Sequence, residues 1–375
     1  MAEKKRNSNL ELMRILCMLM IVFSHCGGHG FESIERVYSF NKYFTEGVTL
    51  LSTAGVMGFV LISGYFVSAS GTDLKRLMKL WGQIWFYSVL CLILFLTVLT
   101  PTEPLGAADI IKSLLPVTYS RYWFATCYIM LMLLSPFLNS FIASVRRETL
   151  FRLIVLLVLL WSVLATFFAA DYGYNIMGWF VALYLISGYI RRYYVPGRHT
   201  AERHLIRALL AFLLLLLSDI LINLAGKYTG SSALLANSAI FAKQNGIFDF
   251  VVALELFLYF LNREPFYNRV VNIAASACFG VYLIHDNFIF RPYLWETLLR
   301  MPEHYGSSAL PLYVLISVLA IYIACTLIDL LRIYTVEKLW MKFVAKAAPP
   351  LNAALERLMT RLQSCADKLS GNKEE

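Results

Sequence analysis

The stretch Leu10–Gly28, LELMRILCMLMIVFSHCGG, decides how the rest of the chain is interpreted. It is long and apolar enough to cross a bilayer as a helix, yet it contains Arg14 and His25. Arg14 and His25 are eleven positions apart, about three turns and about 16 Å of helix rise, so both side chains project from one face. Polar groups in a membrane helix are costly unless they face a cavity or a partner. The stretch therefore predicts a membrane protein with a polar site along its first helix.

The composition of the whole chain agrees with this prediction. Of 375 residues, 59% are hydrophobic and only 15% are charged, whereas soluble domains are about half apolar and a quarter charged. Long apolar runs recur along the chain, so we expect an all-α, polytopic membrane protein with about ten transmembrane helices. Their expected positions are about 10–28, 47–69, 80–99, 121–141, 150–170, 175–190, 205–225, 246–261, 272–291 and 309–331.

The lysines and arginines are distributed unevenly between the expected loops. With the N-terminus in the cytoplasm, the inner segments up to Lys346 hold 21 of them and the outer connections hold eight. Cytoplasmic loops are enriched in these residues, so we expect a cytoplasmic N-terminus. This topology accounts for the net charge of +9, and no nucleic-acid partner is expected. The basic start could also mark a signal peptide. Because polar residues lie in the first apolar run and further spans follow, we expect an uncleaved helix.

The chain is expected to divide into a transmembrane domain at 1–346 and an amphipathic cytoplasmic tail at 347–375. The tail follows Pro349 and Pro350 and repeats apolar residues with four-three spacing, at Leu351, Leu355, Leu358, Leu362, Cys365 and Leu369. This pattern favours a helix lying on membrane lipid at the inner leaflet. The alternative is a short coiled coil that joins two copies into a homodimer, although fewer than three heptads are present.

His25 and Arg14 are the candidate catalytic residues. A neutral imidazole can act as a general base near neutral pH. An arginine at the inner end of the helix suits a phosphate or a carboxylate, because its planar fork is always charged. Taken singly, the two could instead be a helix-packing histidine and an arginine that reaches the interface. Their common face favours the functional interpretation.

Other polar residues extend this candidate site. His285, in the expected span 272–291, lies at a depth similar to that of His25, so the two could line one cavity or simply hydrogen-bond between helices. Glu255 lies within the span 246–261, where it could pair with a base, line water or bind a cation. Lys75, Arg76 and Lys79 follow the second span. They would suit the phosphates of a nucleotide, although the positive-inside bias alone explains such a cluster.

Several familiar chemistries are absent from the sequence. It has no Walker P-loop, GxSxG or GxGxxG motif. Its seven cysteines form no CxxC pair and its six histidines no HExxH motif, so we expect no metal. Cys26 lies about 100° round the helix from His25 and is not expected to carry an acyl group.

Together these motifs resemble the acyltransferase-3 family of membrane acyltransferases. The resemblance spans roughly residues 8–331 and rests on the order and spacing of its motifs along ten helices. They are an arginine and a histidine separated by ten residues (Arg14, His25), the pairs Ser63–Gly64, Arg76 with Lys79, and Trp123–Phe124, and YLIH ending at His285. Lys79 stands where the family often has a second arginine. A lysine there would not bind a phosphate through two parallel hydrogen bonds, as an arginine can.

The resemblance implies a bacterial inner-membrane enzyme that transfers an acyl group, usually acetyl, from cytoplasmic acetyl-CoA. The acceptor would be a hydroxyl of a surface or secreted glycan or of its lipid-linked precursor. By this resemblance Arg14, Arg76 and Lys79, with Lys75 nearby, would hold the CoA phosphates. His25 would act as a general base or carry the acyl group itself. Trp123 and Tyr128 would shape the acceptor side.

Three other functions stay open from the sequence. The first is a transporter or flippase of a glycan or small molecule, with His25, Glu255 and His285 as a proton relay, although no inverted repeat is evident. The second is an acyltransferase that acts on a small molecule, a lipid or an amino acid. The third, a purely structural scaffold, would have no use for the polar pair in the first helix.

Overall fold

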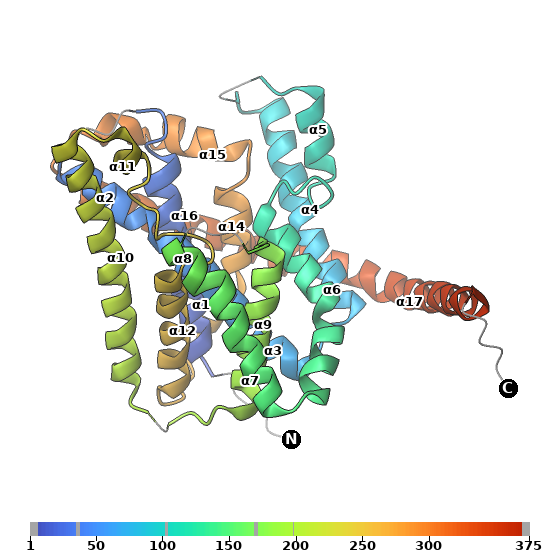
Figure 1. Cartoon of the computed structure of the whole chain (residues 1–375). Helices are drawn as coiled ribbons and strands as arrows, with labels where there is room; N and C mark the ends of the chain where they lie inside the picture. The colour runs from blue at the N-terminus through green and yellow to red at the C-terminus, as the bar shows by residue number, and fades with distance from the viewer. Residues whose placement is uncertain (1–6, 35–37, 102–103, 169–171, 198, 370–375) are drawn as a thin grey trace.

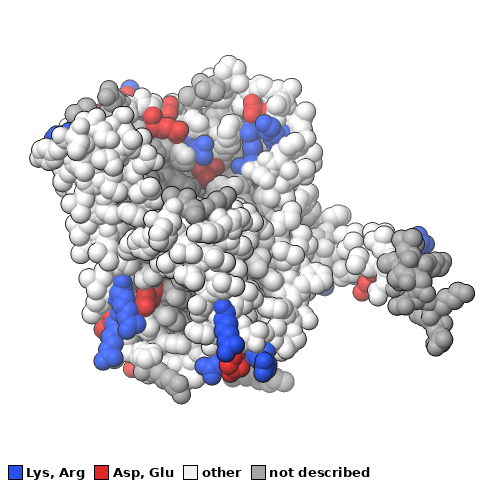
Figure 2. Space-filling model, in the orientation of Figure 1, with Lys and Arg blue, Asp and Glu red and all other residues white. Residues whose placement is uncertain are grey.

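The computed structural model describes residues 7–34, 38–101, 104–168, 172–197 and 199–369. Throughout these residues every regular element is a helix, as the sequence predicts (Figure 1). Charged side chains gather at the upper and lower ends of the face seen in Figure 2, and a broad uncharged belt lies between them. This distribution is the one that a bilayer imposes on a helical membrane protein.

Within the described ranges, seven helical segments are long and apolar enough to cross a membrane. An eighth crossing results if the bent pair Arg269–His285 and Phe290–His304, which turns by 93°, forms one span. The count of ten is therefore not confirmed by length and composition. The seven segments are α1 (Asn9–His29), α2 with α3 (Phe40–Thr49 and Leu51–Ser70), α4 (Leu74–Thr97), α6 (Trp123–Ser144), α7 to α8 (Arg147–Phe168), α10 (Ala201–Thr229) and α16 (Leu310–Tyr334).

Helices also occupy the two other expected spans. α9 (Ile176–Tyr193) has two arginines in its last turn, and α12 (Ile247–Asn262) has only 16 residues. The shorter elements are α5 (Ala107–Leu114), the π-helical turn η1 (Leu159–Leu164) between α7 (Arg147–Val158) and α8 (Ala165–Phe168), α11 (Ser232–Ala236), α13 (Arg269–Ser276), α14 (Cys278–His285), α15 (Phe290–Pro292), the π-helical η2 (Tyr293–Leu298) and the 3₁₀-helical η3 (Met301–His304).

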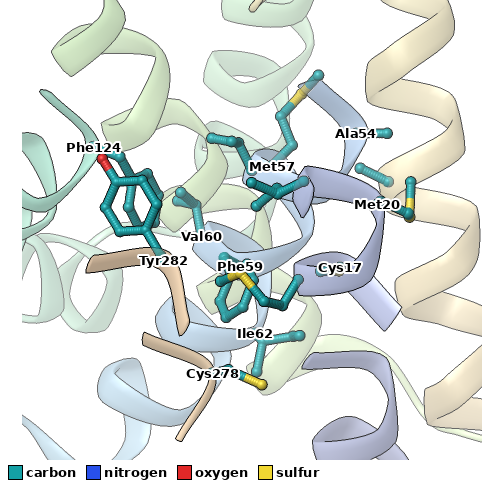
Figure 3. Packing of buried hydrophobic residues seen from close by; sticks show 14 of the residues in the cluster. Cys17, Met20, Ala54, Met57, Phe59, Val60, Ile62, Phe124, Cys278 and Tyr282 are labelled. Atoms are coloured by element: carbon teal, nitrogen blue, oxygen red, sulfur yellow. The ribbon is translucent and has the colours of Figure 1, made fainter. Parts of the chain in front are cut away.

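The core of the bundle is built around α1, α3 and α9. α3 is apolar on all sides and packs between the other two, which is the pattern of a buried helix. Figure 3 shows Cys17 and Met20 of α1 beside side chains of α3 such as Met57. Gly64 permits the close approach of α3 to α9, because a Cβ atom there would lie 2.1 Å from Oγ of Ser187. The expected Ser63–Gly64 motif is thus a site of helix packing.

The expected helix at 272–291 is broken in the structure, which corrects the prediction. α13 ends at Ser276, α14 begins at Cys278, and α14 itself ends at His285. Asn287 then accepts hydrogen bonds from the backbone N–H groups of Ile289 and Phe290, and this local bonding replaces the helical pattern. The chain consequently turns sideways at the depth of His285.

The C-terminal helix α17 (Val336–Leu369) begins earlier than the sequence predicts and continues past Pro349 and Pro350. Its first turns pack on α4, where Nε1 of Trp340 donates to the carbonyl oxygen of Met78 at 3.0 Å. The rest projects away from the bundle, across the direction of the long helices (Figure 1). Its leucines at 351, 355, 358 and 362 are exposed, whereas the side chains of Cys365 and Leu369 lie outside the described ones.

Candidate active site

His25 and His285 meet at the centre of the candidate site. His25 comes from the last part of α1 and His285 ends α14, and Nδ1 of His25 lies 2.9 Å from Nε2 of His285. His285 is fully buried, whereas 16% of the His25 side chain is exposed. The matched depth predicted from the sequence thus corresponds to an interhelical hydrogen bond, with His25 as the more accessible partner.

The hydrogen bonds of this pair define which nitrogen atoms carry protons. Nδ1 of His285 lies 2.6 Å from the carbonyl oxygen of Val281, which can only accept, so Nδ1 of His285 donates. In the neutral ring, Nε2 of His285 then has a lone pair and accepts from Nδ1 of His25. It follows that Nε2 of neutral His25 has no proton. A lone pair on the more accessible ring is what a general base requires.

Asp286 contacts the same site, although the sequence did not place it on the face of His285. Because α14 ends at His285, the next residue leaves the helix and its Oδ1 atom comes 3.7 Å from Nδ1 of His25. Arg291 lies 3.3 Å from the same oxygen, and Nε2 of His29 lies 4.0 Å from it. A carboxylate here would stabilise His25 when it takes up a proton.

His25, His29 and Asp286 also bring one potential metal ligand each to within 4.8 Å of one another. The His25 nitrogen nearest Asp286 is Nδ1, and this atom already bonds to His285. A metal on that nitrogen would have to break the histidine pair, so the present geometry favours the hydrogen-bonded arrangement. The expectation that the protein uses no metal stays a prediction.

An outer cavity of about 280 Å³ lies beside this site. Arg291 connects the two, because it lines the cavity and also pairs with Asp286. Asp109 lines the same cavity and bonds to Arg121 at 2.7 Å, and this hydrogen bond holds the pKa of Asp109 below its usual value. Figure 2 shows acidic and basic side chains around a hollow at this upper end of the molecule. The cavity therefore reaches the polar site through Arg291 and its partner Asp286.

Two adjoining cavities lie towards the other end of α1. The first, of about 210 Å³, is lined by Arg14, Ser63, Phe124 and Tyr128, among others. The second, of about 220 Å³, is lined by Arg76, Lys79 and Tyr128, and both cavities share Leu80, Gln83 and Tyr128. Together they form one cleft, which we call the inner cleft, that extends from the start of α4 to Arg14.

The predicted cationic residues are therefore only partly brought together. Arg14 lines the inner cleft and is held by Glu11 at 2.7 Å. Arg76 also lines it, with Nη1 donating to the carbonyl oxygen of Gly71 at 2.7 Å. Lys75 is exposed and lines neither of the two cavities. The basic cluster of the sequence thus reduces to Arg76 and Lys79 at the cleft.

A polar network that the sequence analysis missed borders the inner cleft. Lys79 pairs with Glu337 of α17 at 2.7 Å, and Glu337 also bonds to Arg332 at 2.8 Å. Arg332 bonds in turn to the buried Asp329 at 2.7 Å, which accepts a hydrogen bond from Gln83 on the cleft wall at 3.3 Å. The network links the start of α17 to the cleft. No local pattern predicts the contacts of Lys79 and Gln83 with this group, because Gln83 and Asp329 are 246 residues apart in the sequence.

Of the remaining predicted site residues, Tyr128 lines the inner cleft, whereas Trp123 and Glu255 do not. Tyr128 donates to Oγ of Ser63 at 3.1 Å, with both residues on the cleft wall. Trp123 contacts Phe180 and lines neither cavity of the cleft. Glu255 pairs with His204 of α10 at 2.6 Å, so it has the basic partner that the sequence allowed but is not a cavity residue of the histidine site. A relay through His25, Glu255 and His285 has no support in this geometry.

Comparison with known proteins adds one finding. A family model described as an acyltransferase domain matches residues 7–329. The match includes the histidine pair, Asp286, Arg291 and the residues named here on the walls of the inner cleft. No curated protein and no solved structure matches the chain.

Proposed function

The chain belongs to the acyltransferase-3 family, and we propose from this premise that it transfers an acetyl group from cytoplasmic acetyl-CoA to a hydroxyl group. The acceptor in this proposal is a cell-surface or secreted polysaccharide or its lipid-linked precursor. The observation that carries the proposal is the hydrogen-bond chain from Val281 through His285 to His25, which supports a basic Nε2 atom on His25.

The proposed reaction is a direct transfer with His25 as general base. Nε2 of His25 takes the proton of the acceptor hydroxyl, and the oxygen attacks the thioester carbonyl carbon. The tetrahedral intermediate collapses as the carbon–sulfur bond breaks. The departing CoA thiolate takes the proton back from His25, so an ester and free CoA result. Asp286 supports this step because it lies beside the nitrogen that stays protonated throughout.

In this proposal acetyl-CoA enters through the inner cleft, and the acceptor approaches from the side of the outer cavity. Arg76 and Lys79 bind the CoA phosphates at the cleft mouth, and Arg14 interacts further in. Glu337 holds Lys79 before the donor arrives, so binding requires Lys79 to exchange a carboxylate for a phosphate. Tyr128 lines the inner cleft along which the donor enters, and no metal takes part.

The proposed setting is the inner membrane of a bacterium, with the N-terminus in the cytoplasm. α9, α12 and the bent pair then complete ten crossings, and every connection falls on the side that the lysine and arginine distribution predicts. α17 lies on the lipid of the inner leaflet through its exposed leucines.

The test uses membrane vesicles that contain the protein and are supplied with acetyl-labelled acetyl-CoA. Label is followed into the glycan and lipid-linked glycan fractions for wild type and His25→Ala. The matched control is Cys26→Ala, which alters the neighbouring buried side chain but not the proposed base. We expect label with wild type and Cys26→Ala, and a loss of about 10²- to 10⁴-fold with His25→Ala. Equal labelling by wild type and His25→Ala, both folded, would contradict the proposal.

A further inference from the structure

An apolar groove of about 440 Å³ lies outside the candidate active site. Its floor consists of buried residues of α9 and α12, namely Ile186, Ile190 and Phe250. Its walls include Val155 of α7 and Leu254 of α12. In Figure 1, α7 runs along the front of the bundle with α9 behind it. The groove therefore opens sideways within the span of membrane-embedded helices, where hydrocarbon is the surrounding medium.

The groove changes from apolar to polar at the end near the start of α7. Tyr189 and Tyr194 line it there with their hydroxyl groups bonded to polar partners. Nε of Arg147 donates to the Tyr189 hydroxyl at 3.2 Å, and Nδ2 of Asn262 donates to that of Tyr194 at 2.6 Å. A tyrosine with an apolar ring and a polar tip is typical of a membrane interface. An amphiphilic occupant would match this change along the groove.

Two positive charges stand together at the polar end. The guanidinium groups of Arg147 and Arg192 lie 5.3 and 5.5 Å from the ring centroid of Tyr193. Arg192 also donates to the carbonyl oxygen of Ile142, and Arg147 to Tyr189. None of these partners carries a negative charge, so the cations are fixed in place but not neutralised by them. Glu148, the residue after Arg147, is an acidic group whose charge acts on Arg147, and an anionic ligand at this end would add a charge partner for the arginine pair.

The helix that forms one wall leaves α-helical geometry beside the groove. α7 continues into the π-helical turn Leu159–Leu164, and both Leu159 and Val163 of this turn line the groove. Such turns are frequent at functional sites because they widen the helix locally. Only 22% of the apolar stretch in Arg147–Phe168 is buried, and Phe151, Leu156 and Phe168 are among its exposed side chains. The wall that α7 forms is therefore packed against the bundle mainly through its side facing α9.

We propose that this groove is a specific binding site for an anionic glycerophospholipid. One acyl chain lies along Ile186, Ile190 and Phe250, and the phosphate contacts Arg147 and Arg192. The charge of the arginine pair selects an anionic headgroup over a zwitterionic one. The bound chain fills the space between α7 and α12 and so stabilises the outlying wall. This inference does not depend on the acyl-transfer reaction, and neither its site nor its test involves the histidine pair.

Native mass spectrometry of the detergent-purified full chain tests the proposal. The protein is incubated with equal amounts of phosphatidylglycerol and phosphatidylcholine, and lipid retained at rising collision energy is counted. Arg147→Gln removes the headgroup contact, and Arg152→Gln is its control on the same helix. Val155→Phe fills the groove, and Leu156→Phe adds the same ring on the adjacent exposed position. Leu254→Phe fills the groove from the opposite wall if Val155→Phe does not fold.

We expect wild type and both controls to retain one phosphatidylglycerol in preference to phosphatidylcholine. Arg147→Gln should lower this preference about tenfold, the effect of losing one hydrogen bond between charged groups. The groove-filling variants should lose retention of both lipids. Equal retention of the two lipids by wild type would overturn the proposal, and so would unchanged binding in the filled variants. Stronger retention of an added polyisoprenyl phosphate would overturn the assignment to a glycerophospholipid.

Discussion

Replacing His285 tests the role of the histidine pair more sharply than replacing His25. His285→Leu removes the atom that accepts the hydrogen bond from Nδ1 of His25, at present 2.9 Å long. His285→Gln keeps an acceptor, because its side-chain amide oxygen reaches a similar distance from the backbone. The two variants therefore separate loss of this hydrogen bond from simple replacement of a buried ring.

The size of the effect follows from the charge that His25 acquires. A hydrogen bond between neutral groups contributes about 0.5–1.5 kcal/mol, and one to a charged group about 1.5–3 kcal/mol. Only the gain on reaching the transition state accelerates the reaction, and that gain is about 1 to 1.5 kcal/mol. His285→Leu should therefore lower kcat roughly five- to thirteen-fold, with little change in KM for acetyl-CoA.

The assay measures initial rates of label transfer in vesicles over a range of acetyl-CoA concentrations. Amounts are normalised to folded protein by size-exclusion chromatography in detergent. His285→Gln should stay within about threefold of wild type, since it preserves most of one hydrogen bond. Unaltered kcat in folded His285→Leu would refute the reasoning. Equal losses in the leucine and glutamine variants would also refute it, because they would indicate a packing role for the ring.

Two other predictions concern the inner cleft and the packing beside it. Arg76→Ala should raise KM for acetyl-CoA about tenfold without changing kcat, as expected for loss of one charged contact. The exposed Lys75 is the control, and Lys75→Ala should behave as wild type. Saturation curves of the labelling rate measure both variants, and equal effects would argue against Arg76 as the phosphate contact. Gly280→Ala should destabilise the fold by about 1–3 kcal/mol, because its Cβ atom would lie 2.1 Å from Cγ of Asp329, which Arg332 and Tyr87 hold in place. Thermal unfolding in detergent should show this loss relative to Gly306→Ala, where the added carbon meets open space, and equal transition temperatures would contradict it.

Hydrophobic patterning predicted the all-helical architecture and the positions of most long helices, because a bilayer requires long apolar runs. It did not predict the break in the expected helix at 272–291. The apolar residues continue through this region, and the end at His285 depends on the hydrogen bonds of Asn287. Asp286 and Arg291 were missed for the same reason. An uninterrupted helix would have directed the Asp286 side chain away from His25.

The residues of the candidate site were predictable where a single helix carried the signal. The spacing of Arg14 and His25 is local. In the structure Arg14 lines the inner cleft and His25 contacts His285. The pairing of Lys79 with Glu337, and of Glu255 with His204, depends on which helices become neighbours. The sequence offers many partners for each charge and does not choose among them. In the basic cluster, Arg76 lines the cleft and Lys75 does not, a difference that their positions in the sequence do not predict.

A single rigid element fixes the distance between the inner cleft and the histidine pair. α1 is an uninterrupted helix of 21 residues that begins five residues before Arg14 and ends four residues after His25 in the sequence. Inserting one residue between them would lengthen the separation by about 1.5 Å and rotate one side chain by about 100° relative to the other. Deleting one would do the reverse. Natural variation within this segment should therefore be confined to substitutions. In the proposed reaction, the length of α1 sets the distance that bound acetyl-CoA has to span.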